Sequence, residues 1–206
     1  MPRMNIPPTR SNLLRVRETL RMARKGYEIL DKKREVLTSE LVQMAHDAET
    51  LQQQLREQFE TAYRGLDEAR LSVGRERVEW AALAVNESVD VQIRLRSVMG
   101  VPIPTIESRG SPPEMSYGLG DTTASLDEAC TLFRELLAQI PAYAEMVTSV
   151  WRLAKELQKT HRRVNALEHV FIPEYEATVA YIESTLEERE REDTFRLKRI
   201  KSRKTG

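Results

Sequence analysis

Apolar residues recur at alternating spacings of three and four through the first third of the chain. They form two series that step by seven residues, one from Leu13 and one from Val16. The members are Leu13, Leu20, Tyr27, Arg34, Leu41, Ala48, Leu55 and Ala62, and Val16, Ala23, Leu30, Leu37, Met44, Leu51, Gln58 and Gly65. This pattern, free of proline, predicts one coiled-coil helix. Over residues 13–66 it would be ~80 Å long, with Thr9 or Ser11 capping its start.

A similar pattern occupies the last third of the chain. One series comprises Ala129, Leu136, Tyr143, Val150, Leu157, Val164 and Phe171, and the other Phe133, Ile140, Val147 and Ala154, until His161 and Glu168 interrupt it. A further apolar set follows at Tyr175, Val179, Ile182 and Leu186. The phase therefore slips near Pro173, which changes local supercoiling. Pro141 and Pro173 lack a backbone N–H, so each is expected to bend or break the helix.

Four polar residues occupy positions where leucine would stabilise a coiled coil better. They are Arg34, Gln58, His161 and Glu168. Polar residues in such positions often fix the register and orientation of the helices at some cost in stability. They also occur where paired helices diverge, and the sequence leaves both interpretations open.

The middle of the chain changes to a period of two. Apolar and polar residues alternate over residues 89–96, which predicts a strand. Residues 98–106 form the expected returning strand, with Pro102 and Pro104 favouring a position at a sheet edge. Residues 100–120 are rich in glycine and proline, which indicates turns and loop.

These patterns predict a mainly α protein. Its N- and C-terminal helices would pair as a long antiparallel two-helix coiled coil, joined by a small central insert with a short helix and a β-hairpin. The short helix is expected over residues 67–87, with Gly74 as its weak point. The expected division is an N-terminal coiled-coil helix over 9–66, the insert over 67–123, a C-terminal coiled-coil helix over 124–201, and a tail over 202–206.

Composition supports paired helices and narrows the function. Charged residues make up 31% and aromatic residues only 6% of the 206 positions, which favours long helices over a compact mixed sheet. The net charge of zero excludes a uniformly basic nucleic-acid binder. A single cysteine, Cys130, excludes a disulfide framework. No apolar run approaches the ~18 residues of a membrane span, so a cytoplasmic protein that meets membranes only through partners is expected.

The charges are distributed unevenly along the chain. Residues 1–34 carry a balance of +7 and residues 196–206 one of +6, whereas residues 35–69 and 174–193 each carry −6. The basic set suits an acidic socket or a phosphate backbone, although a solvated terminus is the plainer alternative. The proposed interface residues are Arg10, Arg15, Arg17, Arg21, Arg24, Lys25, Arg196, Lys198, Arg199 and Lys201.

The sequence offers no catalytic, cofactor-binding or metal-binding arrangement. It contains neither a Walker-type phosphate loop nor an H-E-x-x-H motif. His46, His161 and His169 are too far apart to share one metal. Residues 187–193 are rich in Asp and Glu but are interleaved with arginines, which is typical of a solvated ion-pair face. We therefore expect a chain that is not itself an enzyme.

Several stretches resemble the D subunit of the V-type and A-type ATPases. The most specific are THRRVNALE at residues 160–168, followed by Ile172-Pro173, and EREREDTFRLKRIK at residues 188–201. The opening Pro8-Thr9-Arg10, with Gly26 and Lys32-Lys33-Arg34 farther on, is similar to the start of that family, and Ser97–Pro102 is similar to its middle. The residues that match the family's core motif are Arg162, Arg163, Asn165 and Glu168.

The resemblance implies the central-stalk rotor subunit of a rotary ATPase or ATP synthase. Such a subunit inserts its coiled coil into a head of catalytic A and regulatory B subunits, binds the small F subunit of the stalk, and docks on the C subunit above the membrane rotor ring. Rotation couples ATP synthesis or hydrolysis to proton or sodium transport. The rotor subunit is non-catalytic and needs no cofactor. It is cytoplasmic and peripheral to the cell membrane as part of the complex.

Two other functions fit the residues without the resemblance. One is a non-motor helical scaffold, and the other is a nucleic-acid-binding coiled coil that uses the basic end. Periodicity and charge alone predict only a helical interaction protein. Salt-dependent affinity for a duplex would favour the nucleic-acid function, and a stable complex with a hexameric ATPase head would exclude both alternatives.

Overall fold

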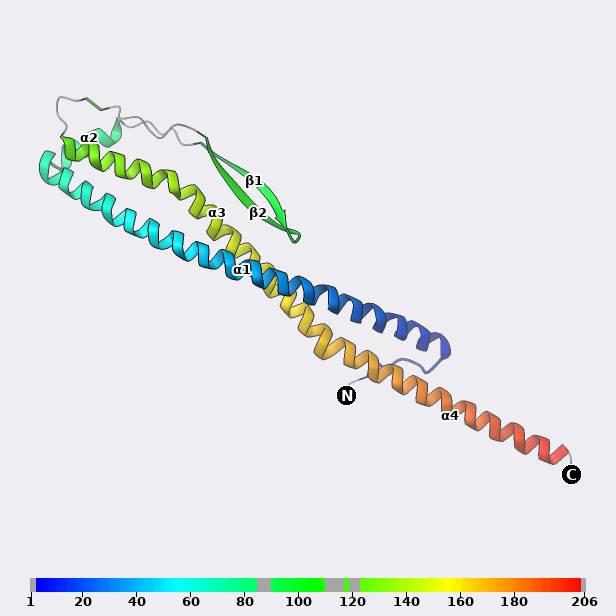
Figure 1. Ribbon diagram of the computed structural model, residues 1–206. Coiled ribbons are helices and arrows are strands. Elements are labelled where there is room, and N and C mark those ends of the chain that lie inside the picture. The colour runs from blue at the N-terminus through cyan, green and yellow to red at the C-terminus, as the bar shows by residue number, and fades with distance from the viewer. Residues whose placement is uncertain (1–2, 85–89, 110–116, 119–122, 205–206) are drawn as a thin grey trace. The chain divides into compact units, whose positions relative to one another are not determined.

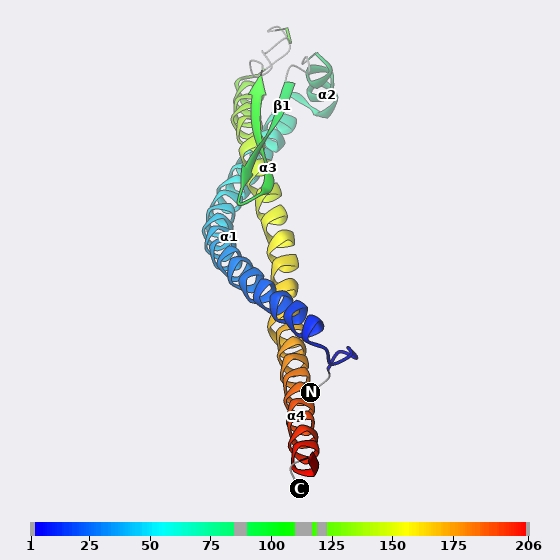
Figure 2. The ribbon, with the colours of Figure 1, turned by 90° about the vertical axis from the view of Figure 1, so that its right-hand side faces the viewer.

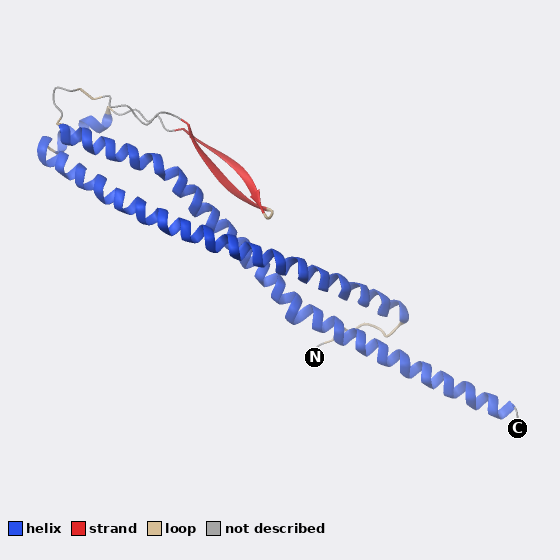
Figure 3. Cartoon of the chain, in the orientation of Figure 1, coloured by secondary structure: helices blue, strands red, loops and turns tan. Residues whose placement is uncertain are grey.

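The computed structural model describes residues 3–84, 90–109, 117–118 and 123–204 (Figure 1). Its elements are α1 (Arg10–Val73), α2 (Arg75–Leu83), β1 (Asp90–Val98), β2 (Val101–Arg109), α3 (Ala124–Ala166), the π-helix η1 (Leu167–Phe171) and α4 (Ile172–Lys204). The predicted mainly α fold with a small helix-and-hairpin insert is confirmed (Figure 3). Val89, the end of the predicted short helix and most of the loop over 107–123 lie outside the described residues.

The chain divides into two compact units. The first consists of Met1–Val36 and Leu157–Gly206, and the second of Leu37–Glu156. In the first unit the start of α1 pairs with α4, and in the second the rest of α1 pairs with α3. Both α1 and the run from α3 through η1 to α4 contribute residues to each unit.

The heptad pattern of α1 is realised as predicted. Its buried apolar residues all lie on the two predicted series or their continuation: Val16, Leu20, Leu37, Leu55, Ala62 and Ala69. The backbone N–H of Asn12 donates to Oγ1 of Thr9 at 3.2 Å, so Thr9 rather than Ser11 caps the helix. The helix ends at Gly74, whose φ of 91° is accessible to glycine at little cost.

The second predicted series on α3 is wrong by one residue from Val147 onward. Val147 and Ala154 are exposed, whereas Leu153 has no exposed surface and Thr160 is also buried. Beyond η1 the series continues at Tyr175 and Ile182, as expected. Thr160 and Ile182 are 22 positions apart, one more than three heptads. One extra residue is therefore accommodated between them.

The π-helix η1 accommodates this extra residue. The N–H of Ile172 donates to the carbonyl oxygen of Leu167, five residues earlier, instead of the usual four. Pro173 explains the position of η1, because proline has no N–H to donate and its ring clashes with the carbonyl four residues before it. The helical run continues through η1, and α3 continues through Pro141, so neither proline breaks it.

The predicted β-hairpin is confirmed, and it lies alongside α3 (Figures 1 and 2). β1 and β2 pair antiparallel, with Val98 opposite Val101. The N–H of Ile106 donates to Oε2 of Glu145 on α3 at 2.8 Å, so its nitrogen points away from β1. Pro102 and Pro104 share this orientation because they lie two and four residues earlier. Their missing N–H groups therefore remove no hydrogen bond from the ladder.

The two-residue turn of the hairpin carries local strain. Met99 has φ 51° and Gly100 has φ 78°, as in a type I′ turn. Residues other than glycine and asparagine are disfavoured in this left-handed region. We expect Met99→Asn to stabilise the hairpin by about 1 kcal/mol, measured as slower amide hydrogen exchange across β1 and β2. Gly100→Ala should have the opposite effect, and unchanged exchange in both variants would contradict the turn assignment.

Candidate interaction surfaces

The predicted basic interface is distributed along α1 and α4 of the first unit. Three of its arginines on α1 step by seven residues, and each forms an ion pair with a glutamate on α4 that also steps by seven. The pairs are Arg10 with Glu190, Arg17 with Glu183 at 2.5 Å, and Arg24 with Glu176 at 2.6 Å. The acidic stretch over 174–193 therefore neutralises part of the basic set. The matching seven-residue steps in the sequence are the signal that could have predicted this pairing.

The other members of the basic set differ in whether they form ion pairs. Arg21 pairs with Glu18 on its own helix, and Arg196 pairs with Glu192. Arg15 and Lys25 form no ion pair within the described part of the chain, and both are exposed. Lys198, Arg199 and Lys201 lie on the exposed last turns of α4. Since surface ion pairs contribute little to stability, even the paired arginines are available to a partner.

The N-terminal segment packs on α4, which the sequence did not predict. The N–H of Met4 donates to Oγ1 of Thr178 at 3.1 Å, and the guanidinium of Arg3 lies 3.9 Å from the ring centroid of Tyr181. Arg189 donates to the carbonyl oxygen of Pro8 at 3.3 Å. Thr178 is fully buried, and its hydroxyl donates to the carbonyl oxygen of Glu174 on its own helix. The N–H of Met4 therefore supplies the hydrogen bond that this buried hydroxyl accepts.

The residues of the recognised motif lie around the end of α3 and η1. Arg162 and Arg163 are exposed and form no ion pair among the described residues. The side chain of Asn165 lies 3.2 Å from Nε2 of His161. Glu168 lies near Tyr27 on α1: desolvation first and the Glu168 carboxylate second raise the pKa of the Tyr27 hydroxyl. The motif thus combines one contact between helices with two arginines open to a partner.

The polar residues of the helix pairs have different surroundings. The contact from Glu168 to Tyr27 connects the two helices of the first unit, which favours a role in register. Gln58 instead lines a groove of about 320 Å³ between α1 and α3, and its Oε1 has no hydrogen-bond partner. This oxygen of Gln58 therefore forms no hydrogen bond to α3. Arg34 pairs with Asp31 of its own helix at 2.5 Å.

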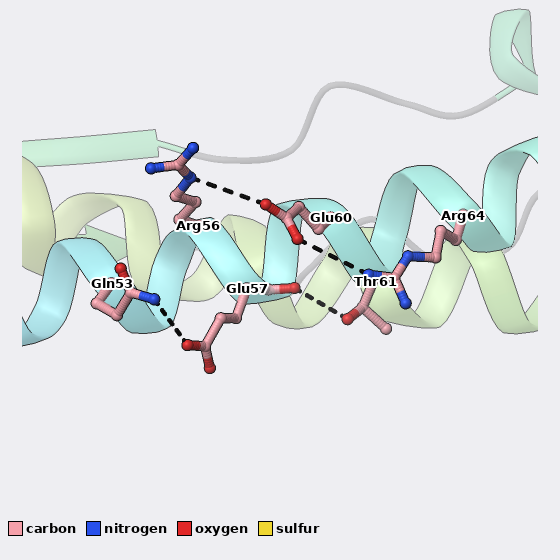
Figure 4. A network of polar contacts seen from close by, with 6 residues as sticks. All are labelled: Gln53, Arg56, Glu57, Glu60, Thr61 and Arg64. Atoms are coloured by element: carbon pink, nitrogen blue, oxygen red, sulfur yellow. Dashed lines mark hydrogen bonds and ion pairs between the residues drawn. The ribbon is translucent and has the colours of Figure 1, made fainter.

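The acidic part of α1 is a solvated helix face. Gln53 donates to Glu57 at 2.9 Å, and Glu60 lies between Arg56 at 3.8 Å and Arg64 at 3.7 Å (Figure 4). These contacts join residues four positions apart on one helix. Each such pair stabilises a helix by about 0.2–0.5 kcal/mol. This network gives no evidence of a ligand-binding site among the residues drawn.

The described part of the second unit exposes apolar side chains on α3 and on β1, among other places. On α3, Val147 and Trp151 are exposed, and the ammonium of Lys155 lies 4.7 Å from the centroid of the Trp151 ring. On β1, Ile93 and Leu95 are both 65% exposed. Apolar surface of this kind is typical of sites that bind other proteins. The heptad assignment missed the first surface because it placed Val147 between the helices.

No reaction centre emerges from the described residues. They contain no group of three His, Cys, Asp or Glu side chains arranged to hold a metal ion. No helix in the described part of the chain is long and apolar enough to span a membrane.

The hydroxyl of Tyr117 donates a hydrogen bond to Asp127 at 2.8 Å. Burial first, and then hydrogen bonds to Cys130 and Asp127, raise the pKa of Tyr117. This part-buried hydrogen bond anchors residue 117 to α3.

Paired long helices, open arginines and exposed apolar faces are typical of a helical component of a larger assembly. Comparison with known proteins identifies that assembly. The sequence profile of the ATP synthase D subunit matches residues 12–202. The chain belongs to the family of ATP synthase D subunits.

Relatives from three organisms match over nearly the full length of this chain. The D subunit of the V-type ATP synthase of Thermotoga neapolitana is 43% identical over 200 residues, covering 97% of this chain and 98% of the relative. The D subunit of the A-type ATP synthase of Thermococcus kodakarensis is 38% identical over 202 residues, covering 97% and 94%. That of Methanopyrus kandleri is 39% identical over 199 residues, covering 96% and 86%. The protein is therefore a subunit of a V/A-type rotary ATPase.

Proposed function

We propose that the chain is the central rotor shaft of its ATPase, which couples ATP synthesis or hydrolysis in the head to proton or sodium transport through the membrane ring. The observation that carries this proposal is the continuity of the helices. α1 and the run from α3 to α4 each extend through both compact units. Torque applied to one unit can therefore be transmitted to the other through two hydrogen-bonded helices rather than through a flexible linker.

An unequal helix pair also supplies the asymmetry that a rotor needs. A single copy inside a threefold head presents a different face to each catalytic site. Charged side chains act over a distance of roughly one Debye length, about 8–10 Å, so exposed basic residues can interact with successive head subunits as the shaft turns. In this proposal the chain is a non-catalytic stalk component, and ATP binds elsewhere in the complex.

The charges suggest how the shaft is oriented. The first unit, with its basic residues on α1 and α4, would enter the head of A and B subunits. The second unit, with the hairpin, would lie toward the C subunit and the membrane ring, on the cytoplasmic side. The small F subunit would bind alongside the helices. Membrane contact would occur through these partners alone.

Reconstitution tests the proposal. The chain is mixed with the purified A/B head ring and the F subunit of its host, separated by size exclusion, and the composition of the complex is measured by native mass spectrometry. One copy of the chain per ring is the expected result. A folded, helical chain that elutes apart from the head would contradict the proposal and favour a separate scaffold.

Arg162 and Arg163 provide a sharper test of assembly. Because both are exposed and unpaired within the described residues, replacing both by alanine should leave the free energy of unfolding within about 1 kcal/mol of the parent. Binding to the head, measured by titration, should weaken at least about tenfold if both contact a partner. Replacing both by lysine keeps the charge and should restore most of the affinity. Unchanged binding of the alanine variant would exclude these arginines from the interface.

A further inference from the structure

The N-terminal strap, residues 3–9, lies against α4 in the first unit. Figure 1 shows it returning from the start of α1 along α4. Every second residue from Met4 to Pro8 is half-buried, whereas the residues between them are exposed. The N–H of Met4 and the carbonyl oxygen of Pro8 hydrogen-bond Thr178 and Arg189, which lie about three turns apart on α4. The strap therefore follows α4 over this length and turns alternate side chains toward the helices.

The strap is also tied to the first turn of α1. The side chain of Asn12 donates to the carbonyl oxygen of Pro7 at 2.9 Å, and its backbone N–H donates to Oγ1 of Thr9 at 3.2 Å. Pro7 and Pro8 each have a fixed φ and no N–H, so this part of the strap is stiff and offers only carbonyl groups to its neighbours. Both of these carbonyl groups accept a hydrogen bond. The strap thus connects the start of α1 to α4 through hydrogen bonds at both of its ends.

Apart from the strap, the contacts of the described residues hold the start of α1 only weakly. Val16 is the first buried residue of the helix, and Leu14 is 66% exposed. Helix ends with few buried apolar contacts open locally and fray. The ion pair between Arg10 and Glu190 does not prevent this, because the two side chains are 80% and 62% exposed and exposed pairs contribute little to stability. The strap supplies the buried contact that the first turns of α1 lack.

We propose that the N-terminal strap is a clamp that holds the first two turns of α1 on α4, and that it thereby positions the basic residues Arg10, Arg15 and Arg17 for a partner. The hydrogen bond from Met4 to Thr178 carries this proposal. Thr178 has no exposed surface, so water cannot replace Met4 as a donor while the helices stay paired. Fraying of α1 would pull the strap away and break this bond. The positioning of the arginines rests on the proposed function, whereas the clamp does not.

Hydrogen exchange at the amides of residues 13–17 tests the clamp in the full chain. Met4→Pro removes the N–H that donates to Thr178, and exchange at these amides should become at least about tenfold faster. The rates at residues 30–36, farther along α1, should stay unchanged. A similar acceleration there would mean general unfolding instead of a released clamp, and would overturn the proposal.

Asn5→Pro is the matched control for this substitution. The N–H of Ile6 donates to the carbonyl oxygen of Met4 at 3.0 Å, and the φ of Asn5 is not positive. Asn5 is therefore the centre of an inverse γ-turn, whose φ of about −75° suits proline. Exchange in this variant should match the parent. Equal rates in Met4→Pro and Asn5→Pro would overturn the clamp.

Thr178 allows the same test from the side of α4. Thr178→Val keeps the shape of the side chain and removes the acceptor, so it should also accelerate exchange at residues 13–17. Thr178→Ser keeps the hydroxyl, and its rates should stay close to those of the parent. Adding Thr178→Val to Met4→Pro should have no further effect, because both substitutions remove the same hydrogen bond. Effects that multiply would show that the two residues act independently, and would overturn the clamp.

Binding to the purified A/B head separates the clamp from the proposed function. Thr178 is fully buried and cannot touch a partner, so weaker binding of Thr178→Val is transmitted through the chain. Its Kd for the head should be at least about threefold higher than that of Thr178→Ser. Equal Kd values would overturn the positioning of the arginines. If the parent chain itself does not bind the head, the proposed function fails, and the exchange rates still decide whether the clamp exists.

Discussion

Leu153→Asp should destabilise the second unit by about 3–5 kcal/mol. Leu153 has no exposed surface, so the substitution removes a buried apolar side chain and places a carboxylate where water cannot reach it. Denaturant unfolding followed by circular dichroism measures the change. A loss of this size would confirm that Leu153 lies in the contact between α1 and α3.

Ala154→Asp is the matched control for this prediction. It introduces the same side chain into the same turn of α3, but Ala154 is exposed. The expected loss is below about 1 kcal/mol, mostly from helix propensity. The heptad pattern of the sequence alone places Ala154 between the helices, so it predicts the opposite order. A larger loss for Ala154→Asp than for Leu153→Asp would show that Leu153 does not pack between the helices.

Deleting one residue from the π-helix should be tolerated. Val170 is 53% exposed, and its removal brings Thr160 and Ile182 to a separation of three heptads. Combined with Pro173→Ala, which restores the N–H needed for an α-helical turn, the deletion should cost no more than about 1–2 kcal/mol. Thermal unfolding and helix content by circular dichroism are the measurements.

A deletion outside the π-helix should behave very differently. Ala180 on α4 is exposed, but removing it rotates all later residues by about 100° relative to Thr178. Ile182, which has no exposed surface, would then leave its position against α1. The expected loss is at least about 3 kcal/mol in the first unit. Equal losses for the two deletions would mean that η1 does not compensate the phase of the helix.

The success of the sequence in predicting the fold varies with the kind of signal. On α1 nothing interrupts the heptads, so Leu37 and Leu55 are buried where the pattern places them. On α3 the apolar residues Val147 and Leu153 belong to two different faces, and simple counting by seven chooses the wrong one. The slip near Pro173 was visible in the sequence, but its effect on earlier residues depends on packing that the pattern does not contain.

The interaction surfaces were less accessible to sequence reasoning. The basic residues were identified, but Arg17 and Arg24 were not connected to Glu183 and Glu176. The contact from Met4 to Thr178 joins residues 174 positions apart and leaves no periodic trace. The link to rotary ATPases came from specific motifs, whereas periodicity alone predicted a helical interaction protein.

Single-molecule rotation tests the shaft function most directly. The head ring is fixed to glass, Cys130 is replaced by serine, and a bead is attached through a single cysteine introduced at Met99 in the exposed hairpin turn. A rotor shaft predicts that ATP drives the bead in one direction, in steps that reflect the threefold head, and that rotation stops when ATP is removed. A complex that holds one copy of the chain and hydrolyses ATP while the bead stays still would contradict it.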